Sequence, residues 1–203
     1  MIDLSDFGRI DIYLFDQLLN GRIAAGMRVL DAGCGGGRNL QYLLRAGYDV
    51  YGADESAESI ASVRQMAAAL APQLPADHFR AEAVEAMTFP DAFADVVISN
   101  AVLHFARDDR HFDAMLRGSW RVLKPNGVFF CRLASSIGME SRMRQLNGRR
   151  HLVPDGSQRY LVDQAFLLEY TQKLGGRLLD PIKTTVVHDM RCMTTWVVRK
   201  EGN

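Results

Sequence analysis

The first two-thirds of the chain alternates between short apolar runs and longer stretches with apolar residues at helical spacing. The short runs are typical of strands buried on both faces, because they are apolar without a break and rich in β-branched residues. The predicted strands cover residues 28–31, 49–53, 78–81, 95–99 and 128–131. The predicted helices cover residues 11–19, 38–45, 56–70 and 112–123. This order predicts an α/β fold with right-handed crossovers, an open parallel sheet and helices on both faces.

The last third of the chain has a different pattern. Residues 134–159 show no clear period and carry five arginines against two acidic residues. A helix is predicted over 163–174, where Gly175 and Gly176 end it. Two strand-like runs follow at 178–187 and 193–198, and they predict a terminal antiparallel pair.

Composition narrows the class of protein but not its function. The 203 residues are 48% hydrophobic and 24% charged, with a formal net charge of zero. A neutral chain gives no electrostatic reason to expect nucleic acid or an anionic membrane as the partner. No apolar stretch is long enough to span a bilayer and the first residues lack a signal-peptide pattern, so a cytoplasmic location is expected. Three scattered cysteines argue against a disulfide framework, no spacing suggests a metal site, and the oligomeric state is left open.

A glycine-rich segment, Gly33-Cys34-Gly35-Gly36-Gly37, follows the first predicted strand. Ligands of open parallel sheets bind at the carboxyl ends of the strands, and glycines let the backbone approach a ligand closely. A helix that begins near Arg38 is expected to aim free N–H groups at the same place. A dinucleotide fingerprint would need a third glycine where Arg38 stands, and Asp31 would repel a pyrophosphate but suits an ammonium group. These features favour the sulfonium cofactor S-adenosylmethionine, although the glycine run alone also fits a flexible turn.

Two acidic residues, Asp54 and Glu55, stand at the end of the second predicted strand. They lie roughly 20 residues past the glycine loop, where a carboxylate is placed to accept hydrogen bonds from ribose hydroxyls. The alternative is that Asp54 is an N-terminal acid of the next helix, beside the predicted cap Ser56.

In combination these segments resemble the motifs of class I S-adenosylmethionine-dependent methyltransferases. Residues 29–39 resemble motif I, in a Cys-Gly-x-Gly-Arg-Asn variant that is similar to small-molecule members of the tellurite-resistance type. Residues 51–54 resemble motif II, 89–104 the stretch that covers motif IV, and 121–127 the turn before the fifth strand. The resemblance covers about residues 28–132. It implies one Rossmann-like domain over 1–203 with a seven-stranded, mostly parallel sheet and a terminal antiparallel strand. Its expected parts are an N-terminal helical cap (1–27), a cofactor-binding core (28–134), a substrate-side insert (135–160) and a C-terminal helix and strand pair (161–203).

The resemblance also implies roles for the matched residues. Asp31 and the first glycines would line the methionine end, Asp54 would hold the ribose, and the loop at Val84 would hold adenine. Many members carry an Asp where this chain has Ala83, so Glu82 or Glu85 is expected to substitute for it. Residues 100–103 would flank the sulfur. The complete set of predicted cofactor-binding residues is Asp31, Gly33, Cys34, Gly35, Gly37, Arg38, Asp54, Glu55, Val84, Glu85, Asn100 and Leu103.

Methyl transfer from a sulfonium needs a base only if the acceptor loses a proton as it reacts. His104, after the fourth predicted strand, is the candidate base, and a structural hydrogen bond is the alternative. His111 is expected to face solvent behind the sheet. The arginine-rich insert is expected to form part of the acceptor pocket or else a solvated loop, and Tyr13 to act as a lid or to pack. The substrate candidates are therefore Tyr13, Arg144, Arg149 and Arg150.

The predicted function is transfer of the methyl group of S-adenosylmethionine to a small-molecule acceptor by an enzyme. Two alternatives stay open at this point. One is a nicotinamide-dependent oxidoreductase on a similar sheet, and the other is a regulator that binds the cofactor without catalysis.

Overall fold

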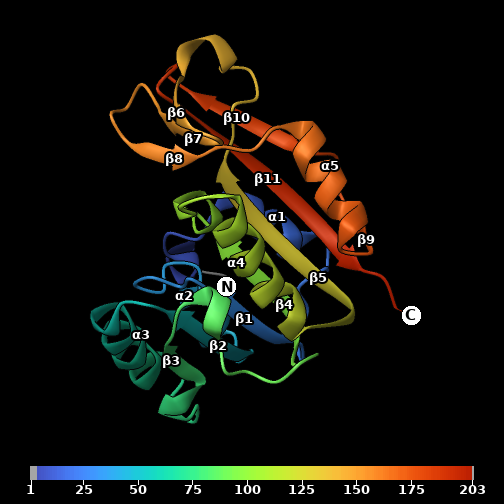
Figure 1. The fold of residues 1–203 in the computed structure, drawn as a ribbon. Helices are drawn as coiled ribbons and strands as arrows, with labels where there is room; N and C mark the ends of the chain where they lie inside the picture. The colour runs from blue at the N-terminus through green and yellow to red at the C-terminus, as the bar shows by residue number, and fades with distance from the viewer. Residues whose placement is uncertain (1–3, 203) are drawn as a thin grey trace.

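The central sheet of the computed structural model, which describes residues 4–202, contains eight strands. Seven lie in the order β10-β11-β5-β4-β1-β2-β3, and β9 pairs with β11 (Figure 1). The strands are β1 (Arg28–Ala32), β2 (Asp49–Asp54), β3 (Phe79–Ala81), β4 (Ala94–Asn100), β5 (Leu123–Ala134), β9 (Gly176–Leu178), β10 (Lys183–Val187) and β11 (Arg191–Lys200). The first five strands are parallel, and β11 is antiparallel to β5, β9 and β10. The predicted mostly parallel sheet with a terminal antiparallel strand is confirmed, and β9 adds an eighth strand to it.

Helices cover both faces of the sheet because successive strand residues bury opposite faces. Val96 of β4 belongs to the core under the N-terminal helices, whereas its neighbour Val97 packs in the core under the C-terminal ones. Both valines are fully buried, as the uninterrupted apolar run predicts. On one face lie α1 (Ile12–Leu19), α2 (Gln41–Arg45) and α3 (Ala57–Leu70), and on the other lie α4 (Asp109–Val122) and α5 (Gln164–Lys173). Short 3-10 turns complete the chain at Leu4–Phe7, Ala76–His78, Val84–Ala86, Leu103–Phe105 and Glu140–Arg142. Within residues 4–202 no helix is both long and apolar enough to cross a membrane.

Four of the five helices begin at a side chain that accepts a hydrogen bond from the first turn. Ser56 does so for α3, as predicted, and Asp11, Asp108 and Asp163 do so for the other three. The exception is α2, which begins at Gln41 after Leu40 and has no side-chain cap. The prediction that this helix begins near Arg38 is wrong. Residues 37–40 form turns instead, and backbone amides of this segment donate hydrogen bonds to carbonyl groups of the same loop. Gly37 N donates to Cys34 O, and Leu40 N donates to Gly37 O.

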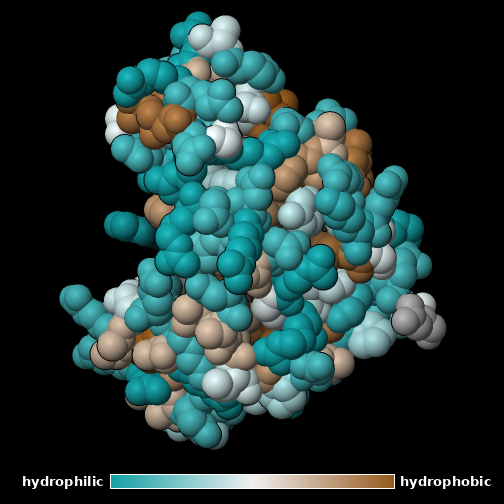
Figure 2. Space-filling model, viewed as in Figure 1, coloured by the Kyte–Doolittle hydropathy of each residue, from teal (hydrophilic) through white to brown (hydrophobic). Residues whose placement is uncertain are grey.

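The insert after β5 is not an aperiodic loop, as the sequence had suggested. It folds into a separate three-stranded antiparallel sheet of β6 (Arg144–Asn147), β7 (Arg150–Leu152) and β8 (Gln158–Tyr160). All four residues of β6 are exposed, so this strand has no buried face to give the sequence a period of two. The small sheet lies beyond the end of β5, at the top left of Figure 1. In Figure 2 its surface is set off from the main body by an indentation on the left.

The C-terminal strands differ from the prediction in one respect. The run over 178–187 is divided, because Pro181 separates β9 from β10. The two pieces pair with successive parts of the long strand β11, β10 near Thr195 and β9 near Val198. The predicted antiparallel pairing of the two last runs is confirmed.

Candidate functional site

A cavity of about 730 Å³ opens at the carboxyl edge of the parallel strands. Its walls come from the segments after β1, β2, β3 and β4 and from the first turns of α4. Strand β1 lies between β2 and β4, so the cavity is at the point where the strand order reverses. The predicted cofactor residues that line it are Gly33, Cys34, Gly35, Arg38, Asp54, Glu55, Val84, Glu85 and Asn100. Gly37, Asp31 and Leu103 lie outside the lining, and Leu103 is fully buried in the core.

The glycine loop is held against the end of β2 by backbone hydrogen bonds. Gly33 N and Cys34 N both donate to Ala53 O, at 2.8 and 2.9 Å. Gly33 has a φ of +89°, and a Cβ there would lie 2.4 Å from Cγ2 of Val102. Only glycine fits this position, because both the backbone angle and the approach of Val102 exclude a side chain.

Asp54 bonds the start of α3 and also lines the cavity. Its Oδ1 accepts from Ser56 N at 2.9 Å, at the start of α3, and its Oδ2 accepts from Gly35 N at 2.8 Å. The side chain therefore ties the glycine loop to the end of β2 while it lines the cavity. A carboxylate oxygen has a second lone pair, so Asp54 keeps acceptor capacity for a ligand hydroxyl. Glu55 beside it is exposed and also lines the cavity.

Asp31, at the end of β1, is a buried carboxylate without a partner. It is 1% exposed, and neither carboxylate oxygen has a hydrogen-bond partner among the described residues. Burial raises the pKa of Asp31 to about 7, while the charge of Arg38 acts to lower it and that of Asp54 to raise it. A buried acceptor left unpaired is costly, so this residue fits a site that receives a donor from a ligand.

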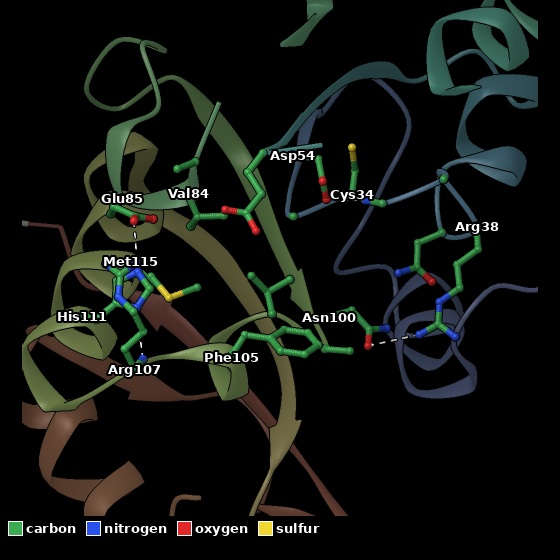
Figure 3. Close-up of a pocket in the computed structure, with 18 residues that line it drawn as sticks. Cys34, Arg38, Asp54, Val84, Glu85, Asn100, Phe105, Arg107, His111 and Met115 are labelled. Carbon is green, nitrogen blue, oxygen red and sulfur yellow. Dashed lines mark hydrogen bonds and ion pairs between the residues drawn. The ribbon is translucent and has the colours of Figure 1, made fainter. Parts of the chain in front are cut away.

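Arg38 and Asn100 lie together at the same end of the cavity (Figure 3). A guanidinium N–H of Arg38 donates to Asn100 Oδ1 at 3.4 Å, which is a long hydrogen bond. The amide nitrogen of Asn100 is buried and has no acceptor among residues 4–202. This end of the cavity therefore offers an unused donor on Asn100.

The opposite end of the cavity carries a Glu–His pair that the sequence did not predict. His111 Nδ1 accepts from Arg107 N at 3.1 Å, so its Nε2 carries the proton that bonds Glu85 Oε1 at 3.0 Å. Burial acts to raise the pKa of Glu85, but its backbone N–H and the bond from His111 lower it below the usual value. The expectation that His111 faces solvent is wrong. It is in the first turn of α4, which begins at the carboxyl edge of the sheet just after β4. Glu82, the other substitute considered for the acid missing at Ala83, is bonded to Thr88 instead.

His104 is bonded in a way that argues against its predicted role as a base. Its Nδ1 accepts from Ala134 N at 3.1 Å, so in the neutral ring the proton is on Nε2 and no lone pair is free. The side chain is 5% exposed. Burial lowers its pKa to about 3, with a smaller contribution from the charge of Arg159. His104 therefore has the alternative role that the sequence allowed, a structural hydrogen bond, with Nε2–H as a donor.

A second cavity, of about 320 Å³, adjoins the first. Its walls come from the end of β5, the insert sheet, and the turn between β10 and β11. Arg38, Ala101 and Phe105 line both cavities. The arginines in its wall are Arg38, Arg132, Arg159 and Arg191.

The predicted substrate residues lie outside both cavities. Arg144 is exposed on β6, Arg149 pairs with Asp163 at 2.9 Å, and Arg150 donates to a backbone carbonyl at 3.1 Å. Tyr13 bonds the hydroxyl of Thr185 at 2.6 Å and is in a packed position. Residues of the insert line the second cavity, but the three insert arginines chosen from the sequence do not. Arg159, at the insert's end, lines the second cavity, whereas Arg149 and Arg150 bond other partners and Arg144 is exposed.

A family model described as a methyltransferase domain matches residues 30–131, which is half of the 203 residues. The chain belongs to this family. The expectation of a class I S-adenosylmethionine-dependent methyltransferase, an enzyme family with that compound as its cofactor, is confirmed at this level. The nicotinamide-dependent alternative is wrong for a methyltransferase domain.

Curated relatives share part of this methyltransferase domain. It is 34% identical over 105 residues to the ubiquinone biosynthesis O-methyltransferase of Chelativorans sp. (strain BNC1). The match covers 52% of this chain and 39% of that protein. The chain spans about two fifths of the length of this and two further ubiquinone biosynthesis O-methyltransferases that it matches.

Solved structures share the fold at low sequence identity. A SAM-dependent methyltransferase from Methanosarcina mazei has a TM-score of 0.74 at 18% identity, over 92% of this chain and 98% of that one. The 1,6-didemethyltoxoflavin-N1-methyltransferase of Burkholderia thailandensis, with bound 1,6-didemethyltoxoflavin and S-adenosylhomocysteine, has a TM-score of 0.71 at 19% identity. That match covers 98% of this chain and 80% of the other. These likenesses establish the architecture of the methyltransferase domain.

Proposed function

We propose that this methyltransferase domain transfers the methyl group of S-adenosylmethionine to a small-molecule acceptor. The observation that carries the proposal is a set of unpartnered buried polar groups after β1 and β4: the carboxylate of Asp31, at the end of β1, and the amide nitrogen of Asn100, which lines the larger cavity, have no hydrogen-bond partner within residues 4–202. The methionine moiety of the cofactor is a zwitterion, and it would satisfy both groups. Its ammonium matches the carboxylate of Asp31, and its carboxylate matches Arg38 and the Asn100 amide. Asp31 is 1% exposed and does not line the cavity, so its contact with the ammonium requires a local rearrangement at this end of the cavity.

The remaining lining fits the adenosine part of the cofactor. Asp54 and Glu55 would accept hydrogen bonds from the ribose hydroxyls. At the far end, Glu85 is held by His111 through one oxygen, which leaves the other as an acceptor for the amino group of adenine. Val84 and Met115 supply apolar walls on either side. Glu85 thus takes the part that an acid at position 83 plays in many family members.

When bound, S-adenosylmethionine supplies a methyl group that is already activated by its positive sulfur. The protein then has to position the acceptor in line and exclude water, and positioning is worth roughly 7–11 kcal/mol in well-oriented reactions. Ala101 and Phe105 stand between the two cavities and would bring the acceptor against the cofactor. Because His104 does not offer a lone pair, we propose that it orients the acceptor or the wall rather than removing a proton.

Calorimetry tests cofactor binding directly. Titration with S-adenosylmethionine and S-adenosylhomocysteine is expected to show binding to both, and NAD is expected not to bind. The Asp54→Asn variant should bind the product cofactor at least about tenfold more weakly, because its amide cannot accept equally at both positions. The matched control is Asp91→Asn, whose side chain is 79% exposed and outside the cavity. If neither sulfur compound binds the wild-type protein, the proposal is wrong.

Release of S-adenosylhomocysteine then separates an enzyme from a regulator. Incubation with S-adenosylmethionine and a panel of small hydroxy, amino and thiol compounds is expected to give acceptor-dependent release. Cofactor binding without release over a broad panel would favour the remaining alternative, a regulator that binds the cofactor without catalysis.

A further inference from the structure

The second cavity contains two arginines, Arg159 and Arg191, that the proposed cofactor binding does not use. We propose that this cavity binds the methyl acceptor, and that the acceptor is a small molecule with an apolar body and an anionic oxygen group, a carboxylate or a phosphate. This inference rests on the proposed methyl transfer, because it names the substrate class of the same site. It replaces the insert arginines expected from the sequence with a different set.

The position of the cavity places its occupant against the cofactor. The walls of the two cavities meet at Arg38, Ala101 and Phe105, so a molecule in the smaller one faces the larger one across these residues. Ala101 has a φ of +64°, an unfavourable backbone angle for a residue with a side chain. Strain of this kind concentrates at ligand sites. A methyl acceptor has to stand next to the methyl donor, and this cavity meets that condition.

More arginines than acidic residues line the wall of this cavity. Arg38, Arg132, Arg159 and Arg191 line it, and Asp155 is its one carboxylate. Arg132 is neutralised by Asp11 at 3.1 Å. Within residues 4–202, no carboxylate lies within 4.0 Å of Arg38, Arg159 or Arg191 in the ion pairs of this structure. Guanidinium groups bind carboxylates and phosphates through paired N–H donors, so an anion is the ligand that this wall favours.

These arginines do not belong to one basic stretch of the chain. Arg38 follows β1, Arg159 is in β8 and Arg191 begins β11, and the fold brings all three to one cavity. The guanidinium of Arg159 lies 4.8 Å from the ring centre of Phe105, which is in the wall shared by the two cavities. A solvated basic loop would not gather side chains from three distant segments around one hollow.

Much of the remaining lining is apolar, although His104, Ser135 and Ser157 also contribute to it, and the volume of the cavity limits the size of the ligand. Met143, Val153, Leu161, Val187 and Met193 form much of the wall. A volume of about 320 Å³ is at the lower end of the range for small-molecule sites, roughly 300–1,000 Å³. The occupant is therefore a compact apolar body that ends in an anionic group.

The test uses three simple probes of the same shape. The full chain is saturated with S-adenosylhomocysteine and titrated with benzoate, phenyl phosphate and the neutral benzamide, with binding followed by ligand-observed NMR. Benzoate or phenyl phosphate is expected to bind at least about tenfold more tightly than benzamide, and the stronger of the two identifies the anionic group. Affinity for the anion should fall as salt is added, whereas binding of benzamide should not change.

Two arginine variants test whether the anion binds in this cavity. Arg159→Ala and Arg191→Ala are each expected to weaken binding of the preferred anion roughly tenfold and to leave S-adenosylhomocysteine affinity unchanged. The matched control is Arg177→Ala, which removes an arginine paired with Glu201 on the distant strand β9. Circular dichroism melts check that each variant is folded.

The outcomes separate this inference from the proposed function. Two results overturn the inference while S-adenosylhomocysteine still binds and the cofactor assignment stands. In one, benzamide binds with the same affinity as benzoate and phenyl phosphate; in the other, neither anion binds. Unchanged anion binding in both arginine variants overturns it equally. If S-adenosylhomocysteine itself does not bind, the proposed function has failed first.

Discussion

The substitution Asp31→Asn should make the protein more stable and less able to bind its cofactor. Asp31 is buried without a hydrogen-bond partner, and burial raises its pKa from 3.8 to about 7. A carboxyl with a raised pKa holds its proton more tightly in the folded state than in the unfolded state. Its contribution to stability is therefore present at low pH and is lost as the pH rises from about 4 to about 7.

The size of the effect follows from the pKa. A change from 3.8 to about 7 corresponds to about 4 kcal/mol above pH 7 and about 2 kcal/mol at pH 5. Asn has a similar shape and no charge, so the variant has no charged group to bury. Its free energy of unfolding should exceed that of the wild type by up to these amounts at each pH. The figures are upper limits because a buried amide without a partner has a desolvation cost of its own. For a chain of this length each kcal/mol raises the melting temperature by roughly 2–4 °C.

The assay combines urea unfolding between pH 5 and pH 8 with calorimetric titration of S-adenosylhomocysteine. The gain in stability should increase with pH, and the affinity should fall roughly ten- to hundredfold because the partner of the ammonium loses its charge. Asp91→Asn, at an exposed surface pair with Arg121, is the control and should change neither quantity much. An Asp31→Asn protein that is less stable than wild type at pH 8, or one that binds the product cofactor normally, would refute the reasoning.

Three further predictions concern the walls of the two cavities. Gly33→Ala should lower both the melting temperature and S-adenosylhomocysteine affinity, by 1–2 kcal/mol or more in stability (on the order of the left-handed backbone penalty), because its Cβ would also meet a side chain at 2.4 Å. His104→Leu should cost roughly 1–3 kcal/mol of stability in urea unfolding, because it leaves the buried N–H of Ala134 without an acceptor. Glu85→Ala should weaken S-adenosylhomocysteine binding about tenfold in calorimetry, because it removes the acceptor for adenine.

The first two of these predictions have an internal control. Gly36→Ala lies in the same loop, where nothing is within 4 Å of a new Cβ, and its melting temperature should stay near that of wild type. His104→Asn can keep an acceptor near the position of Nδ1 and should recover part of the stability that Leu loses. Equal stability of the Leu and Asn variants would contradict the structural role of His104. Unchanged S-adenosylhomocysteine affinity in Glu85→Ala would contradict the adenine assignment.

Much of the sheet could be predicted from the sequence because a strand buried on both faces is an uninterrupted run of apolar residues. The apolar run around Val96 and Val97 has no polar alternation, since one residue faces each of two helical layers. The glycine loop could also be predicted, because its backbone conformation requires a particular residue type. Gly33 is required by its own backbone angle and one close neighbour, and these needs restrict the residue type at a single position.

The strands of the insert and the start of α2 could not be predicted, because their sequences have no clear pattern. The strands of the insert are three or four residues long, and β6 has no buried face, so no period marks them. The predicted start of α2 is wrong because α2 has no capping side chain. The backbone hydrogen bonds of the turns before it do not require a particular residue type, so the sequence does not reveal them.

The sequence by itself determined the sheet, the glycine loop and the carboxylates at the strand ends, because each restricts the residue types within one short segment of the chain. Only the tertiary structure decided which side chains surround the cavities. It brought His111 to Glu85, left Asp31 without a partner, and gathered Arg159 and Arg191 beside the cofactor site. Those arrangements join segments that are far apart along the chain, and their distances are set by how the layers pack. Local pattern therefore predicted the cofactor, whereas the choice of acceptor depends on the packed fold.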